Sequence, residues 1–208
     1  MTSNDKERLD ALDAVAILHE TRVRAQRQLD ASPPFLLLIG AVVFLVAFGA
    51  VWWSVRTQSP YLGPSGGALA VMYGGILAWI VVVTAVVQRA ARGVSGPSTR
   101  RKAYRGGYFV VILAYSLFQG ALFHAGASHA VVYGIFPASA PWLFGGTVVL
   151  THGVILERGR SIILGIALIT LGIGAAFAGP IAAWLVSGIG ICVTLVSLAA
   201  VQSLRRRA

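Results

Sequence analysis

The sequence predicts an all-α, polytopic membrane protein with six transmembrane helices, the fourth interrupted by prolines, and an N-terminal amphipathic helix in the cytoplasm. Apolar residues make up 57% of the 208 residues and charged residues only 12%, against about 25% charged in a typical soluble domain. Six apolar runs are long enough to cross about 30 Å of hydrocarbon. Basic residues flank these runs almost entirely on one side. Together, these observations predict the fold class.

The first 34 residues read as a cytoplasmic helix that precedes a membrane domain of residues 35–208. Asn4 and Glu7 have the spacing of a capping box at the start of a helix. Pro33 and Pro34 end the helix, because proline lacks the amide donor and restricts the residue before it. The chain therefore divides into a short appendage and one six-helix domain.

One face of this N-terminal helix carries Leu9, Leu12 and Val23 at helical spacing. Two interpretations remain open. The helix lies on the cytoplasmic surface of the membrane, or it docks on a cytoplasmic protein partner or a second subunit. In the second interpretation, Leu9, Leu12 and Val23 bind the partner.

Five of the apolar runs read as uninterrupted spans of about 20 residues, the length that a bilayer requires. A very tight turn, residues 178–180, joins the last two spans, so we expect them to form a close hairpin. The five spans are residues 35–54, 68–88, 107–124, 161–177 and 180–202.

The remaining run, residues 130–156, is apolar but contains Pro137 and Pro141. Non-helical backbone at membrane depth is tolerated only where protein or water satisfies its polar groups. One interpretation is a shallow outer connector over residues 125–140 followed by a short span over 141–156. The other is a kinked or re-entrant helix that lines a cavity together with Gln119.

The net charge of +10 is distributed as a topology signal. All but one of the 17 Lys and Arg residues fall in the terminal segments and in the connections after spans two and four, and Arg56 alone lies on the opposite side. Basic residues near span ends are retained in the cytoplasm, so both termini should be inside and should meet anionic lipid headgroups. No basic stripe carries interleaved aromatics, which argues against nucleic acid as a partner.

The amino-acid composition is typical of a bacterial protein. Arg far outnumbers Lys, and Ala, Gly and Val are abundant, as in a high-GC bacterial genome. The sequence therefore predicts a multi-pass protein of the bacterial plasma membrane.

The distribution of acidic residues argues against an enzyme. All seven Asp and Glu residues lie in predicted cytoplasmic segments, and no charged residue lies inside a span. Proton-coupled carriers generally use buried ionisable groups, and carboxylate hydrolases need two acidic groups at one aqueous site. The single cysteine, Cys192, cannot build a disulfide or a thiolate metal site within the chain. We therefore expect a non-enzymatic protein without a metal or cofactor.

Four polar residues near spans three and four are the candidate ligand-binding residues. Tyr115 and Gln119 lie inside span three, and His124 and His129 lie at its outer end. A buried amide needs partners for both its oxygen and its nitrogen, so Gln119 bonds either to a neighbouring helix or to a ligand. The two histidines are interfacial residues, a two-histidine metal or haem site, or a pair that senses pH.

Small residues in the last hairpin provide a further candidate contact. Gly172 and Ala176, like Gly174 and Ala178, are four residues apart on one face of span five. Such faces let helices approach closely. They predict either packing within the chain or a homodimer seam.

For function, the sequence predicts an accessory, sensor or scaffold component that acts through its cytoplasmic helix. The alternative rests on architecture: an interfacial helix, six spans and a basic loop after the second span look like the permeases of ATP-driven exporters. That resemblance implies a separate ATPase partner, coupled through residues 92–105, which include Arg100 and Arg101. No sequence motif supports it, so it is an analogy of fold.

Overall fold

A computed structural model describes residues 34–90, 98–155, 157 and 159–207, and all of its regular elements are helical, with no strand among the described residues. Residues 1–33 lie outside this set, and with them Leu9, Leu12 and Val23. The cytoplasmic helix and its boundary with the membrane domain therefore stay predictions.

The helices follow the predicted spans closely. At the helix ends that are joined by short connections, the predicted and observed bounds differ by two residues or fewer. At the opposite ends, some helices extend beyond the predicted bounds, because the helix continues into basic residues. The elements are α2 (Pro34–Val55), α3 (Gly66–Ala90), α4 (Ser98–His124), the π-helical turn η1 (Val131–Ile135), α5 (Phe136–Ile155), α6 (Gly159–Phe177) and α7 (Gly179–Arg207).

Within the described residues, four stretches are long and apolar enough to cross a membrane, namely Pro34–Val55, Gly66–Val86, Val131–Ile155 and Gly179–Leu204. The apolar parts of α4 and α6 are shorter and comprise Val110–His124 and Ser161–Phe177. The prediction of a helical chain with several membrane-spanning lengths is therefore confirmed.

The predicted shallow connector over residues 125–140 is wrong. The chain is helical without a break from Val131 to Ile155, and both Pro137 and Pro141 lie within this stretch. The kinked-helix alternative describes the backbone correctly, because a π-helical turn precedes α5. A proline can lie inside such a helix when neighbouring side chains satisfy the carbonyl groups that it leaves without a donor.

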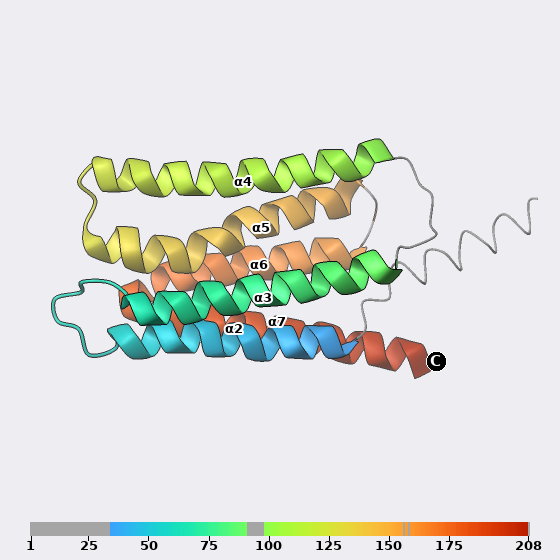
Figure 1. Ribbon diagram of the computed structural model, residues 1–208, viewed down its shortest axis with the longest axis horizontal. Helices are drawn as coiled ribbons and strands as arrows, with labels where there is room; N and C mark the ends of the chain where they lie inside the picture. Colours follow the sequence, from blue (N-terminus) through green and yellow to red (C-terminus); the bar gives the residue numbers. More distant parts are fainter. Residues whose placement is uncertain (1–33, 91–97, 156, 158, 208) are drawn as a thin grey trace, which may run out of the picture.

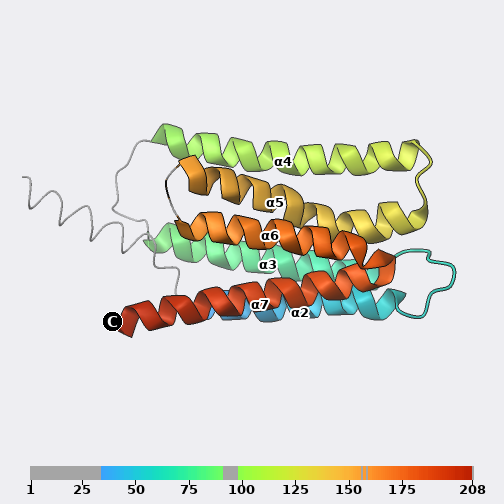
Figure 2. The same ribbon diagram turned by 180° about the vertical axis from the view of Figure 1, so that it is seen from behind.

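The helices lie roughly parallel to one long axis and run alternately up and down (Figure 1). The connections from α2 to α3, from α4 to η1 and from α6 to α7 all lie at one end, which we call the loop end. The C-terminus lies at the opposite end, and α7 runs beside α2 over most of its length (Figure 2). The tight turn between α6 and α7 confirms the predicted close hairpin; Gly179 adopts a φ of 83° there.

Four elements form the core, and two flank it. The main buried cluster joins α2 to α7 and the start of α5, with Val51, Val55 and Trp184 almost fully enclosed. A second cluster joins α2, α6 and α7 around Ala41, Leu168 and Ile191, of which Ala41 is 2% exposed. By contrast, α3 packs mainly on α2, and α4 mainly on η1 and α5.

Glycines allow α5 and α6 to approach closely. A Cβ atom on Gly165 would lie 2.6 Å from the backbone nitrogen of Leu150, and one on Gly153 would lie 2.7 Å from that of Ile162. Gly172 is used in the same way, against Leu143. Packing within the chain is therefore confirmed for Gly172. Gly174 has open space around it, and the homodimer prediction stays untested.

Candidate functional site

The π-helical turn η1 creates an unusual need for hydrogen-bond donors. The N–H of Phe136 donates to the carbonyl of Val131, five residues earlier. The next N–H in this pattern would serve Val132, but residue 137 is a proline and has none. In an α-helical pattern, residue 137 would serve Tyr133 instead. Pro137 therefore leaves Val132 O without a donor in the π pattern and Tyr133 O without one in the α pattern.

Side chains from two other parts of the chain supply the missing donors. Gln119 Nε2, from α4, donates to Val132 O over 3.0 Å. Tyr61 Oη, from the loop between α2 and α3, donates to Tyr133 O over 2.9 Å. π turns of this kind are rare and recur at functional sites. We therefore take η1 and its two side-chain partners as the candidate functional site.

Aromatic side chains hold α4 against this site. The ring of Tyr115 stacks on that of Phe136 with centroids 5.1 Å apart, and Phe118 lies 5.5 Å from the same ring. Further toward the loop end, Phe123 lies 6.4 Å from Tyr133. Tyr115 and Gln119 are four residues apart, so they lie on the same face of α4. The structure thus brings both of these predicted residues to the helix break.

The position of Tyr61 depends on a single amide side chain. Gln58 Oε1 accepts hydrogen bonds from the backbone N–H groups of Leu62 and Gly63, over 3.0 and 3.1 Å. Gln58 Nε2 donates to the carbonyls of Ser54 and Gly63. The amide is fully satisfied by these four bonds. It converts a Gly- and Pro-rich connection into an ordered loop that carries Tyr61 onto η1.

A third element completes the network around Tyr61. Trp184 Nε1, on α7, donates to Tyr61 Oη over 3.3 Å, so the hydroxyl accepts one bond and donates another. Burial raises the pKa of the Tyr61 hydroxyl above its ordinary value, and the bond from Trp184 opposes this to a smaller extent. The neutral, hydrogen-bond-donating form of Tyr61 is therefore favoured.

The helix interior just beyond the break is held by two buried serines. Ser139 Oγ donates to Ile135 O and Ser187 Oγ, on α7, donates to Ala138 O, both over 2.7 Å. Ser187 is fully buried. These bonds bring polar side chains to two carbonyls that lie close to the prolines, one before Pro137 and one between Pro137 and Pro141.

Below the serines, the core contains an indole donor with no hydrogen-bond acceptor among the described residues, Trp142 Nε1. The rings of Phe44 and Phe48 surround this indole, with centroids 5.9 and 5.6 Å from it. Phe44 meets it edge-on at 64°, an arrangement in which an aromatic face can receive a weak N–H contact. The indole therefore serves packing in this structure.

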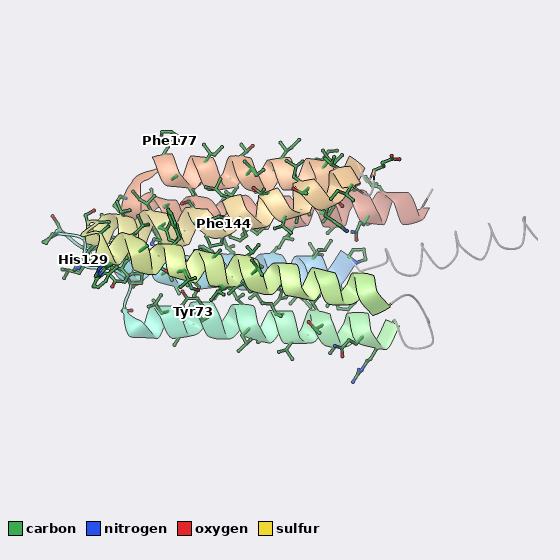
Figure 3. All side chains as sticks on the ribbon, turned by 90° about the horizontal axis from the view of Figure 1, so that it is seen from above. Tyr73, His129, Phe144 and Phe177 are labelled. Atoms are coloured by element: carbon green, nitrogen blue, oxygen red, sulfur yellow. The ribbon has the colours of Figure 1, made fainter. Side chains whose placement is uncertain are left out.

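The two predicted histidines lie near the loop end, and their role stays a prediction. His129 meets the ring of Tyr133 edge-on with centroids 5.6 Å apart, so it lies beside the site (Figure 3). His124 ends α4 and is exposed. Among the described residues, no group of three or more His, Cys, Asp or Glu side chains could hold a metal ion. Arg100 and Arg101 lie in the first turn of α4, where only the backbone is described.

Sequence reasoning missed Gln58, Tyr61, Trp184 and Ser187. A signal for the site was present, because a proline inside an apolar span must leave a carbonyl without a backbone donor. The identity of the donors was not accessible in this way, since Tyr61 and Ser187 are far from Pro137 in the chain. The site contains only neutral donors and backbone carbonyls, a composition suited to fixing helix positions.

Comparisons of the chain with models of protein families, with curated proteins and with solved structures find no match.

Proposed function

We propose that the chain is a six-span protein of the bacterial plasma membrane, with both termini in the cytoplasm, that acts as a non-enzymatic accessory or sensor component. In this proposal the N-terminal helix binds a cytoplasmic protein through Leu9, Leu12 and Val23. Helix α4 then relays the state of that partner to the helix break at the loop end. Hydrogen bonds between neutral groups hold the elements around the helix break together, which suits a part that transmits movement.

The observation that carries this proposal is the way α4 is attached. Among the side chains of α4 that the structure describes, those of residues 110–124, the hydrogen bond and ring contacts to η1 and α5 come from Tyr115, Phe118, Gln119 and Phe123, near the loop end. From there, α4 and α5 diverge toward the opposite end (Figure 3). A helix held at one end can change its tilt at modest cost in buried contacts.

The positions of the charges and connections support six spans. The loop end carries three connections, whereas α3 ends and α4 begins at the opposite end, where the C-terminus also lies (Figure 1). At the loop end, the guanidinium of Arg56 lies 3.2 Å from the ring centroid of Trp53. Such amphipathic groups favour headgroup depth. This supports a loop end on the outside and α4 and α6 as full spans.

The second candidate is a permease-like subunit of an ATP-driven transporter. The observation that favours it is that α4 begins at Ser98, within the basic segment 92–105 that would couple to an ATPase. Movement imposed there would reach η1 through the same helix. In this case, Arg100 and Arg101 contact the ATPase.

A pull-down in mild detergent from the native host tests both candidates. For the accessory role, Leu12→Asp combined with Val23→Asp should remove the co-purifying partner. The matched control is Ala14→Asp combined with Ala25→Asp, which adds the same charge at the same spacing on the opposite face of the predicted helix. Equal recovery of the partner with both double variants would contradict the proposal.

For the permease role, Arg100→Glu combined with Arg101→Glu should remove a co-purifying P-loop ATPase. Arg100→Lys combined with Arg101→Lys keeps the charge and should retain it. Recovery of no other protein from any of these preparations would contradict both roles.

A further inference from the structure

The hydrogen bonds around η1 define two alternative registers for the same helix. In the observed register, the N–H of Phe136 serves Val131 O, and Gln119 must serve Val132 O. In an α-helical register, the N–H of Phe136 would serve Val132 O, four residues earlier. Val132 O would then already have a backbone donor, so a bond from the Gln119 side chain would be a second one and would no longer be needed to satisfy this carbonyl. The amide of Gln119 therefore selects the π register over the α register.

The bond from Tyr61, by contrast, does not distinguish between the two registers. Pro137 cannot serve Tyr133 O in the α register, and in the observed register Tyr61 serves this carbonyl. The bond from Tyr61 is therefore useful in both registers and favours neither. Of the two donors that reach the helix break, only the one carried by α4 discriminates between them.

A change of register would move the chain on the α4 side of the break. When a π turn becomes an α turn, its hydrogen-bonded ring contains one residue fewer. The preceding residues then rotate by about 100° and shift by about 1.5 Å along the helix axis. Those residues lead through a short loop to His124, the last residue of α4. The register of η1 and the position of α4 are therefore mechanically linked through the loop and through Gln119.

We propose that η1 is a two-register switch, set by Gln119, that converts movement of α4 into rotation of the segment before α5. When α4 withdraws Gln119, Val132 O takes the N–H of Phe136 and the turn becomes α-helical. This inference depends on the proposed function only for its role in the cell. The two registers are defined by backbone hydrogen bonds, so they can be tested in the purified protein without a partner.

The test is a nitroxide scan of residues 125–131, one cysteine at a time, in full-length protein that carries Cys192→Ala and is reconstituted in lipid nanodiscs. The measured quantity is the accessibility of each label to dissolved oxygen, which follows the helix face that each residue occupies. In a Gln119→Leu background, which removes the amide at nearly constant volume, we expect the accessibility pattern to shift by about one residue. Gln119→Asn, whose amide is one methylene shorter, should give the same shift if the leucine variant does not fold.

Two control variants distinguish a change of register from a general loss of stability. Ser116→Ala lies on the same helix, and its hydroxyl bonds to Ile112 O within α4, so the pattern should not shift. Tyr61→Phe should weaken the fold without a shift, because its bond is useful in both registers. An unshifted pattern in both Gln119 variants would overturn the proposal, as would an equal shift in Tyr61→Phe. None of these outcomes depends on a cytoplasmic partner, so failure here and failure of the pull-down are distinguishable.

Discussion

At the scale of single residues, the break in the fourth apolar run is explained by counting donors and acceptors. Pro137 removes one backbone donor, and the π turn adds one carbonyl that the helix cannot serve. Two side chains, Gln119 and Tyr61, meet these two needs. A buried carbonyl left without a donor costs about 1–3 kcal/mol. Val132 is buried, so substitution of Gln119 should lower stability well beyond the loss of its own packing, whereas the bond from Tyr61 is exposed and its loss should cost less.

The Tyr61 hydroxyl gives a prediction with a defined pH dependence. Its pKa in the folded protein is raised above the ordinary value of 10.0 by burial. The resulting stability is fully present below pH 10 and is lost as the pH rises from there through the raised pKa, because the unfolded chain loses the proton first. Tyr61→Phe should lower the free energy of unfolding by about 1 kcal/mol at neutral pH.

The check is thermal unfolding of both proteins in the same detergent between pH 7 and 11. The difference in melting temperature between wild type and Tyr61→Phe should be constant up to about pH 10 and should then shrink. A difference that stayed constant throughout, or that widened above pH 10, would show that the hydroxyl is not held in its neutral form.

Gly134 gives a steric prediction at the same site. A Cβ atom there would lie 2.7 Å from Pro180 Cβ and 3.1 Å from both Pro180 Cα and Tyr61 Cζ. Gly134→Ala should therefore lower the free energy of unfolding by about 1–3 kcal/mol. Gly145→Ala is the control, since it lies in α5 with nothing within 4 Å, and should be neutral or slightly stabilising. Equal melting temperatures for the two variants would contradict the close contact.

At the scale of elements, the closest helix pair is α5 with α6, and each helix presents glycines to residues of the other along the seam. Membrane helices gain little from burying apolar surface against one another, so close approach of backbones contributes much of their association. The sequence showed small residues in span five but not which of them face a neighbour. That depends on the rotation of each helix, which is set by all of its contacts at once.

Two glycines of α6 allow a matched test of this seam. A Cβ atom on Gly165 would collide with the backbone of Leu150, whereas Gly174 has nothing within 4 Å. Gly165→Ala should lower the free energy of unfolding by about 1–3 kcal/mol, and Gly174→Ala should raise it by up to about 1 kcal/mol through helix propensity. Both would be measured by thermal unfolding of the purified protein in the same detergent. A loss of stability in Gly174→Ala alone would point instead to a seam with a second copy.

At the scale of the whole molecule, the arrangement of helix ends makes the proposed topology testable. Ser128 is exposed at the loop end, and Glu157 is exposed in the connection at the opposite end, between α5 and α6. In a Cys192→Ser background, a membrane-impermeant maleimide should label Ser128→Cys in intact cells. It should label Glu157→Cys only after permeabilisation, because the proposed topology places the basic connections in the cytoplasm. Labelling in the reverse order would invert the topology.

The sequence by itself determined the helical class, the apolar spans and their ends near the loops, because hydrophobic length and terminal turn residues are local properties. It also pointed to Gln119 and Tyr115 as unusual inside a span. Only the tertiary structure decided that the fourth run is a continuous helix with a π turn. Whether Pro137 ends a helix or lies within one depends on donors such as Tyr61, Gln119 and Ser187, which other elements bring to it. Such donors are distant in sequence, and only the packing of the helices brings them together.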